Sequence, residues 1–489
     1  MATELLLEIG TEEIPAGYLK KGLRELKTLA EACMEENRIE IAGRLYTCGT
    51  PRRLVLIGEF LSETQTELVQ EVTGPPRTVA YDAEGRPTKA AIGFARKQGV
   101  PVEELKCIET PKGEYLHVRQ QLPGRPTMEI LAEALPKLIA EIAWPKSMRW
   151  GGVGFSFVRP IHWVNALFGN KVIPFEIAGV KSGRSTRGHR FMAPEAIEVS
   201  GVQDYLDMME KMYVLIDQEK RESVVEGLCR EAAGRAGGEM ARDKELIATV
   251  ANLVEYPSVV CGSFDEAFLE LPESVLITVM KKHQKYFSVH DAEGRLMPNF
   301  LAVNNTVARD ETVTRRGHER VLRARLSDAA FFFKEDLKSP LGDRLEDLKR
   351  VIYQAELGTS HAKVLRFTRL AESMGKRLLP DRLDDLRSVA GMCKCDLVTQ
   401  MVTEFPSLQG VMGKEYARAE GKPEEICLAI HEHYLPVRAG GELPTSELGA
   451  IIGCADRMDT IAGCFAIGLE PSGRADPFRC ADTRLLLSG

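Results

Sequence analysis

The sequence predicts a multidomain α+β protein, in which a mixed N-terminal α/β region and an α+β domain are followed by an all-α domain. Its 489 residues are enough for about three domains of ordinary size. Apolar residues make up 44% of the chain and charged residues 28%, the balance of a globular protein with a buried core. Strand-like segments are frequent before residue 330 and fade after it, so the last domain is expected to be helical.

Residues 1–72 are expected to form the mixed α/β region. The apolar segments Leu5–Ile9 and Leu54–Phe60 predict two strands. Between them, Ala16–Asn37 carries leucines at spacings of three and four residues, which predicts a helix with an apolar face. The stretch Thr73–Arg77, with one glycine and two prolines, indicates a domain boundary.

Residues 73–330 predict an α+β domain, because strand-like and helix-like segments alternate there with glycines and prolines between them. The predicted strands are Glu114–Gln121, Ile161–Phe168, Lys171–Ile177 and Asn299–Asn304. The predicted helices are Met128–Ile142, Val202–Glu210 and Asp217–Ala236.

Residues 331–478 predict the all-α domain, because four segments have the apolar periodicity of amphipathic or buried helices. These segments are Arg344–Ser373, Asp381–Met401, Pro423–His433 and Glu447–Phe465. Residues 479–489 are expected to be a separate, atypical tail.

The chain is expected to be a cytoplasmic protein that does not bind membranes. No stretch approaches the roughly 20 apolar residues of a membrane span, and the N-terminal apolar run, which carries Glu4 and Glu8, does not resemble a signal peptide. The eleven cysteines include no Cys-x-x-Cys pair, which is typical of reduced thiols. Because the net charge is −7, any RNA contact must depend on local basic clusters.

Motifs of nucleotide-dependent catalysis are missing from the sequence. It contains no Gly-x-x-x-x-Gly-Lys-Ser/Thr phosphate loop and no nucleophile elbow. We therefore predict no catalytic residue, no resident cofactor and no ATP-binding active site in this chain.

The first basic cluster spans Lys181–Arg190 and contains no acidic residue. Its arginines Arg184, Arg187 and Arg190 recur every third residue among glycines and hydroxyl residues, which let a backbone approach a phosphate closely. These three arginines are candidate RNA contacts. The alternative is a solvated, flexible loop.

The second basic cluster, Arg315–Arg325, holds five arginines and one glutamate. If a helix opens at Gly317, then Arg316, Arg320 and Arg323 share one face through their spacing of four and three residues. A row of guanidinium groups suits bidentate phosphate contacts, so these arginines are candidate RNA contacts. The alternative is a network of ion pairs with acids of a neighbouring domain.

A third basic stretch, Met280–Phe287, mixes lysines with aromatic residues. Such a composition can hold a nucleic-acid backbone and stack a base. The alternative is a helix end whose lysines face water.

The helical domain contains a pattern that can be compared with HD-type phosphohydrolases, which bind a divalent ion through a His, a His-Asp doublet and a distant Asp. The doublet position reads Cys395-Asp396 after Lys394, and Asp456 would be the distant acid. The candidate imidazoles are His361, His431 and His433. A thiol at the doublet position suits a hard metal ion poorly. We therefore predict no metal site, and expect hydrogen-bonded or ion-paired roles for Asp396 and Asp456.

Seven segments carry a resemblance to one known family. They are Leu5–Ala16, Thr50–Leu54, Lys146–Trp150, Phe157–Trp163, Ser185–Phe191, Val321–Ala329 and Gln409–Gly413. In this order and number they resemble the beta subunits of the heterotetrameric bacterial glycyl-tRNA synthetase, and the resemblance covers residues 1 to about 478.

The resemblance implies a division of labour. In this family the alpha subunit carries the class II active site, which activates glycine with ATP and Mg²⁺, while the beta subunit holds tRNA(Gly) and is required for aminoacylation. The implied partners are thus the alpha subunit, in an α₂β₂ assembly, and tRNA(Gly). Residues 73–330 would resemble the B3/B4 region of phenylalanyl-tRNA synthetase, and residues 331–478 an HD-like domain. The family pattern stops after Phe478, so a C-terminal truncation without the anticodon-binding domain is expected.

We expect the chain to position tRNA and not to edit it. Glycine is the smallest amino acid, so a tight synthetic site already rejects larger ones by overlap, and editing is unnecessary. Two alternatives stay open on the sequence: an HD-type metal-dependent phosphohydrolase, and a scaffold that only assembles with the alpha subunit.

Overall fold

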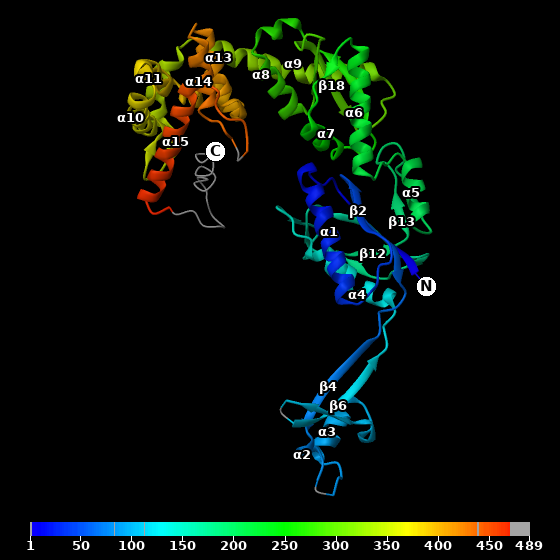
Figure 1. The fold of residues 1–489 in the computed structure, drawn as a ribbon. Helices are drawn as coiled ribbons and strands as arrows, with labels where there is room; N and C mark the ends of the chain where they lie inside the picture. The colour runs from blue at the N-terminus through cyan, green and yellow to red at the C-terminus, as the bar shows by residue number, and fades with distance from the viewer. Residues whose placement is uncertain (1, 83, 112, 438–439, 470–489) are drawn as a thin grey trace. The chain divides into compact units, whose positions relative to one another are not determined.

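Contacts between residues divide the computed structural model into two compact units. Unit 1 comprises the described residues up to 228 together with 247–258 and 304–307, and unit 2 comprises the remaining described residues. The structure describes residues 2–82, 84–111, 113–437 and 440–469 (Figure 1). Within these ranges no helix is both long and apolar enough to cross a membrane. The predicted tail, residues 479–489, lies outside them.

A mixed seven-stranded sheet forms the centre of unit 1, with the order β11-β12-β9-β1-β3-β2 and with β10 paired to β9. Strand β1 (Ala2–Thr11) pairs antiparallel with both β3 (Arg53–Ser62) and β9 (Ile161–Phe168). The other strands are β2 (Leu45–Thr50), β10 (Lys171–Val172), β11 (Glu176–Ile177) and β12 (Val180–Gly183). The sheet thus combines strands from both sides of residue 72, and the domain division at that residue stays a prediction.

Helices cover both faces of this sheet, which explains the continuous apolar run of its central strand. One face packs against α1 (Ala16–Glu36) and α4 (Thr127–Glu141). On the other face, Leu6 packs with α5 (Val202–Lys211). Because side chains alternate along a strand, Glu8 shares the face of Leu6, and its carboxylate is fully buried.

Unit 1 has a second, smaller core around the three-stranded sheet β4-β6-β5. Its elements are β4 (Leu68–Pro76), α2 (Arg77–Ala80), α3 (Lys89–Gln98), η1 (Val102–Glu104), β5 (Lys106–Thr110) and β6 (Gly113–Leu122). Two short hairpins complete the unit: β7 (Met148–Arg149) with β8 (Ser156–Phe157), and β13 (Ser185–Arg187) with β14 (Ala196–Glu198). The chain passes between the units in α6 (Gln218–Arg235) and α7 (Lys244–Ala251).

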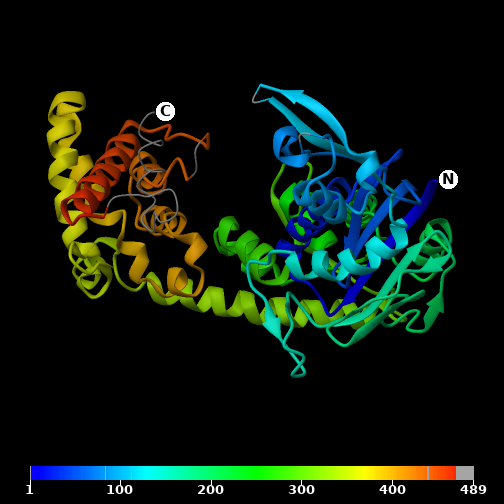
Figure 2. The ribbon, with the colours of Figure 1, turned by 90° about the horizontal axis from the view of Figure 1, so that it is seen from below.

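Unit 2 begins with a four-stranded sheet in the order β15-β17-β18-β16. Its strands are β15 (Glu239–Met240), β16 (Ser258–Ser263), β17 (Phe287–His290) and β18 (Leu296–Asn304). Before β17 lie η2 (Glu266–Glu270), α8 (Glu273–Thr278) and the π-helical turn η3 (Val279–Gln284). The long helix α9 (Glu311–Asp336) then runs without a break across residue 330, as Figure 2 shows.

The rest of unit 2 is helical and shares one core with the elements before it. Helices α10, α14 and α15 pack together in the red, orange and yellow part of Figure 1. The longer helices are α10 (Ser360–Leu378), α11 (Leu383–Met392), α13 (Val411–Ala419), α14 (Glu424–Glu432) and α15 (Glu447–Ala466). The shorter elements are η4 (Leu341–Arg350), β19 (Ile352–Gln354), β20 (Gly358–Thr359), η5 (Pro380–Arg382), η6 (Cys395–Val398), α12 (Gln400–Glu404) and η7 (Pro406–Leu408).

The mixed α+β composition with a helical C-terminal region confirms the coarse fold class, but three predicted elements are wrong. The predicted helix Arg344–Ser373 is interrupted by the β19–β20 hairpin, whose second strand begins at Gly358 with φ +88°. The predicted helix Asp381–Met401 is broken before Thr399, whose side chain caps α12 by accepting from the backbone N–H of Val402. The predicted strand Lys171–Ile177 is two short strands, separated by a segment that contains Pro174.

Candidate nucleic-acid interface

Helix α9 presents the arginines of the second basic cluster on one exposed face. It begins at Glu311, after Asp310, whose side chain accepts a hydrogen bond from the backbone N–H of Thr312. The helix therefore opens six residues before Gly317, where the sequence analysis placed its start. The spacing still sets the side chains Arg316, Arg320 and Arg323 along one face, and all three are exposed. The buried residues of the helix, Leu322, Leu326, Ala329 and Asp336, lie on other sides.

None of these three arginines forms an ion pair within 4.0 Å with an acid of the described ranges, although Arg316 is near enough to Asp310 to help lower its pKa. Their neighbours do: Arg315 lies 4.0 Å from Glu319, and Arg325 lies 3.8 Å from Glu404. The ion pairs that were considered as the alternative thus involve Arg315 and Arg325, and they do not include the three arginines of the exposed face. Three guanidinium groups that project into solvent from a rigid helix suit the phosphates of a nucleic-acid backbone.

The first basic cluster is placed differently, on the short β-hairpin of unit 1. Arg184 is half-buried, and its guanidinium donates to the backbone oxygen of Asn170 at 3.2 Å. Arg187, the last residue of β13, is exposed. Arg190 lies 2.5 Å from the carboxylate of Glu12 and 3.5 Å from that of Glu13. The structure therefore spreads this trio over a backbone contact, an exposed position and an ion pair.

Replacing Arg190 with alanine should lower the stability of unit 1 by no more than about 1 kcal/mol at pH 7, because the pair with Glu12 is partly exposed. The hydrogen bond from Arg190 holds the pKa of Glu12 below its usual range. A carboxylate with a lowered pKa stabilises the fold above its unfolded pKa of about 4.3 and loses this effect as the pH falls.

Thermal unfolding of wild type and Arg190→Ala at pH 7, 5 and 4 measures this contribution. The difference between the two proteins should shrink as the pH falls, and the double variant with Glu12→Gln should cost little more than the single one. A difference that stays constant from pH 7 to pH 4 would contradict the ion-pair explanation.

The third basic stretch does not offer its aromatic rings to a nucleic acid. Tyr286 and Phe287 are buried. The Tyr286 ring stacks on Phe300 at 4.7 Å between centroids, and its hydroxyl lies 2.7 Å from Nδ1 of His318. Lys281 lies 2.5 Å from Asp243. The hypothesis that this stretch stacks a base is therefore wrong, because the apolar core of unit 2 takes up the rings.

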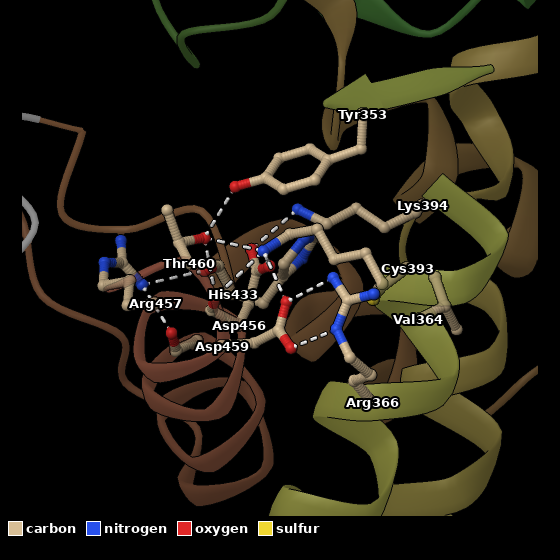
Figure 3. A network of polar contacts seen from close by, with 12 residues as sticks. Tyr353, Val364, Arg366, Cys393, Lys394, His433, Asp456, Arg457, Asp459 and Thr460 are labelled. Atoms are coloured by element: carbon tan, nitrogen blue, oxygen red, sulfur yellow. Dashed lines mark hydrogen bonds and ion pairs between the residues drawn. The ribbon is translucent and has the colours of Figure 1, made fainter. Parts of the chain in front are cut away.

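In the helical region, Asp456 of α15 binds two lysine ammonium groups (Figure 3). Lys363 of α10 lies 2.8 Å from its Oδ1, and Lys394 lies 2.9 Å from its Oδ2. Burial would raise the pKa of the Asp456 carboxyl, but the two ammonium groups outweigh burial and hold that pKa well below its ordinary value. Lys363 also donates to Thr460 at 2.6 Å and lies 3.4 Å from Asp459.

The carboxylate of Asp396 is held by backbone groups and takes no part in this cluster. Its Oδ2 accepts hydrogen bonds from the backbone N–H groups of Gly410 at 2.6 Å and Gly413 at 3.2 Å. Burial raises the pKa of Asp396 to about 6, although these hydrogen bonds act in the opposite direction. Asp396 and Asp456 thus have the hydrogen-bonded and ion-paired roles that the sequence analysis expected.

The residues at the HD-type positions do not fit a divalent ion. Of the candidate imidazoles, His433 lines the same cavity as Asp456, with its Nδ1 at the backbone oxygen of Ile430, whereas His361 lies 3.4 Å from Glu346. Over the described ranges, no three His, Cys, Asp or Glu side chains are grouped as a metal site requires. A cavity of about 510 Å³ opens beside the cluster, but the Lys363 and Lys394 ammonium groups in its wall are already bound to Asp456.

Sequence reasoning missed a buried charge cluster in unit 1, where three of the seven recognised segments meet. Arg53 is fully buried between Glu8 and Glu255, at 3.1 Å from each carboxylate. Its guanidinium also donates to the backbone oxygen of Arg187 at 2.8 Å. The hydroxyl of Tyr205 donates to Glu8 at 3.1 Å. A signal was present in the sequence, since two adjacent arginines precede an apolar strand, where charged residues are otherwise rare.

Comparison with known proteins gives one consistent result. A family model described as glycyl-tRNA synthetase beta subunit matches residues 5–481. The glycine--tRNA ligase beta subunits of Syntrophus aciditrophicus and Syntrophotalea carbinolica are each 49% identical over 478 residues, which cover 98% of this chain and 69% of theirs. That of Geobacter metallireducens is 49% identical over 475 residues, or 97% of this chain and 69% of its own length.

Proposed function

Because this chain belongs to the glycyl-tRNA synthetase beta subunits, and so is a subunit of glycine--tRNA ligase, we propose that it holds tRNA(Gly) for glycylation at the alpha subunit. The observation that carries this proposal is the exposed face of α9, where Arg316, Arg320 and Arg323 lack acidic partners among the described residues. Exposed guanidinium groups without internal partners can neutralise phosphates and release counterions from RNA.

The helix gives these arginines a fixed spacing. At 1.5 Å of rise per residue, the Cα atoms of Arg316 and Arg323 are about 10 Å apart along the axis, so one helix face can contact more than one phosphate. Such contacts fix register and orientation and carry no sequence information. Held in this way, the 3′ end of the tRNA would reach the alpha subunit in a reactive position, and precise placement lowers a barrier by several kcal/mol.

The beta-subunit family implies an alpha subunit as partner. The proposed assembly is α₂β₂ in the cytoplasm, with ATP and Mg²⁺ bound by the alpha subunit and no cofactor in this chain. Within this chain, residues 73–330 would form a B3/B4-like module and residues 331–478 an HD-like domain that serves as a scaffold. The segment after residue 469 is outside the described part of the chain.

The direct test replaces Arg316, Arg320 and Arg323 with alanine and measures tRNA(Gly) binding at several salt concentrations. If each arginine contributes about 1 kcal/mol, affinity should fall on the order of 100-fold. The slope of log K against log salt should become shallower by roughly 3, about one per lost phosphate contact. With the alpha subunit present, glycylation should require correspondingly more tRNA.

A matched control removes three exposed cations from another helix, Arg369, Lys376 and Arg377 of α10. This control changes the net charge by the same amount but leaves the α9 face intact, so the salt slope should stay within experimental error of wild type. Equal losses of tRNA affinity in both triple variants would mean that the effect comes from overall charge, and would overturn the proposal. An α9 variant that binds tRNA normally would favour a scaffold that only assembles with the alpha subunit.

A further inference from the structure

Arg52 is a buried arginine whose guanidinium forms no hydrogen bond or ion pair with any described side chain. Only 7% of the residue is exposed, and its Nε has no hydrogen-bond acceptor. Across the described residues, no side-chain hydrogen bond or ion pair involves its guanidinium. Arginines are almost never buried this deeply without acceptors, because desolvating an unpaired charge is costly. The adjacent Arg53, by comparison, has two carboxylates at 3.1 Å.

Arg52 lines a small pocket in unit 1. The pocket has a volume of about 250 Å³ and is lined by Glu12, Arg52, His162, Trp163 and Arg187. The guanidinium carbon of Arg52 lies 5.7 Å from the centroid of the Trp163 ring. Trp163 is only 7% exposed, and its indole Nε1 also lacks an acceptor. Two residues of the pocket wall thus carry a buried hydrogen-bond donor without an acceptor, and one of the two is a cation, which favours an anionic ligand that accepts hydrogen bonds.

The acids near the pocket make their hydrogen bonds and ion pairs to groups other than Arg52 and Arg187. Glu12 is the acid of the wall, and its two oxygens are already bound, one by His162 at 3.0 Å and the other by Arg190 at 2.5 Å. Glu255 attracts Arg52 at longer range. Its Oε1 is occupied by Arg53 at 3.1 Å and by the Thr50 hydroxyl at 2.6 Å, while its buried Oε2 makes no hydrogen bond. Arg52 and Arg187 thus remain without an acid within 4.0 Å among the described residues.

We propose that this pocket binds a phosphate group through Arg52 and Arg187, either a backbone phosphate of tRNA or that of a free nucleotide. Phosphate oxygens can accept from both guanidinium groups, whose planar donor geometry suits them. A volume of about 250 Å³ is below that of ordinary cofactor sites, so a single charged group fits better than a whole cofactor. The tRNA source rests on the proposed function, while the phosphate site itself does not.

Trp163 supplies a reporter that does not depend on activity. In the full-length chain, the indole N–H signal of Trp163 can be assigned in a ¹H–¹⁵N NMR spectrum by comparison with Trp163→Phe, because the chain has only three tryptophans. Titration with inorganic phosphate should move this signal until it saturates, and sodium chloride at equal ionic strength should not. A signal that responds to both salts alike, or to neither, would overturn the proposal.

Two variants identify the arginine that is responsible. Arg52→Lys keeps the buried positive charge but loses the planar donor fork, and should weaken phosphate binding at least roughly tenfold. Arg44→Lys is the matched control, since Arg44 is exposed and pairs with Glu59 outside the pocket. It should bind phosphate as wild type does. If Arg52→Lys does not fold, Arg187→Gln at the exposed position serves instead, and unchanged binding in that variant contradicts the proposal.

Competition then separates the two sources of phosphate. If tRNA(Gly) occupies the pocket, adding it should move the Trp163 signal and abolish its response to phosphate. A signal that responds to adenosine 5′-monophosphate but not to tRNA would assign the site to a free nucleotide. If the α9 variant loses tRNA binding and the Trp163 signal shows no phosphate response, the proposed function is supported and the phosphate site is rejected. If the Trp163 signal responds to phosphate and the α9 variant binds tRNA normally, the phosphate site is supported and the proposed function is rejected.

Discussion

Replacing Asp456 with alanine should destabilise unit 2 by about 3–5 kcal/mol, because it removes the acid that two buried ammonium groups share. Lys363 keeps a contact with Asp459 at 3.4 Å, whereas Lys394 would lose its carboxylate altogether. A buried charge without a partner costs far more than the pair contributes, so most of the loss should come from Lys394.

Hydrogen exchange of the α10 and α15 amides, read together with urea unfolding, measures this loss where it occurs. The double variant Asp456→Ala with Lys394→Met should recover much of the stability, because the unpaired charge is then removed. Asp384→Ala at the start of α11 is the control, since that side chain is 97% exposed, and its effect should stay within about 0.5 kcal/mol. A double variant less stable than Asp456→Ala would contradict this explanation.

The same ion pairs predict how stability depends on pH. The pKa of Asp456 is held below its usual value, so its contribution is present above the unfolded pKa of about 3.9 and is lost as the pH falls below it. The difference in stability between wild type and Asp456→Ala should therefore be nearly constant from pH 5 to 8 and shrink in acid.

Replacing Arg53 with leucine should have an effect of similar size on unit 1. The change leaves Glu8 and Glu255 fully buried without the guanidinium that lies 3.1 Å from each, and the expected cost is about 3–5 kcal/mol. Burial would raise the pKa of Glu255, but Arg53 outweighs burial and keeps it below the ordinary value. In the variant this pKa should rise, so part of the loss is relieved when Glu255 takes up a proton in acid.

The amides of β1 and β3 report on this change, because both strands lie beside the cluster. Arg44→Ala is the control, since it removes an arginine–glutamate pair of the same chemistry from an exposed site on the same sheet and should cost less than about 1 kcal/mol. Similar losses in both variants would mean that burial does not govern the effect. Adding Glu255→Gln to Arg53→Leu should restore part of the stability.

Long elements with a regular apolar period were predictable from the sequence. The strand Ile161–Phe168 and the helix around Glu447–Phe465 were placed within a residue or so, because periodicity and burial act on each of them locally. Short elements were not, since the β19–β20 hairpin and the η6–α12 break depend on single residues such as Gly358 and Thr399. The spacing of Arg316, Arg320 and Arg323 was predictable, because helix geometry alone puts them on one face.

The family and the candidate arginines could be inferred from the chain without coordinates, because motif segments and helical spacing are properties of residue order. Which of these cations are available to bind RNA could not be inferred in this way, because their availability depends on groups that are distant in sequence. Arg190 is neutralised by Glu12, 178 residues away, while Arg52 is enclosed beside Trp163 without an acceptor. The free energy of a charge depends on its solvent and on its nearest opposite charge, and only the folded chain brings these together.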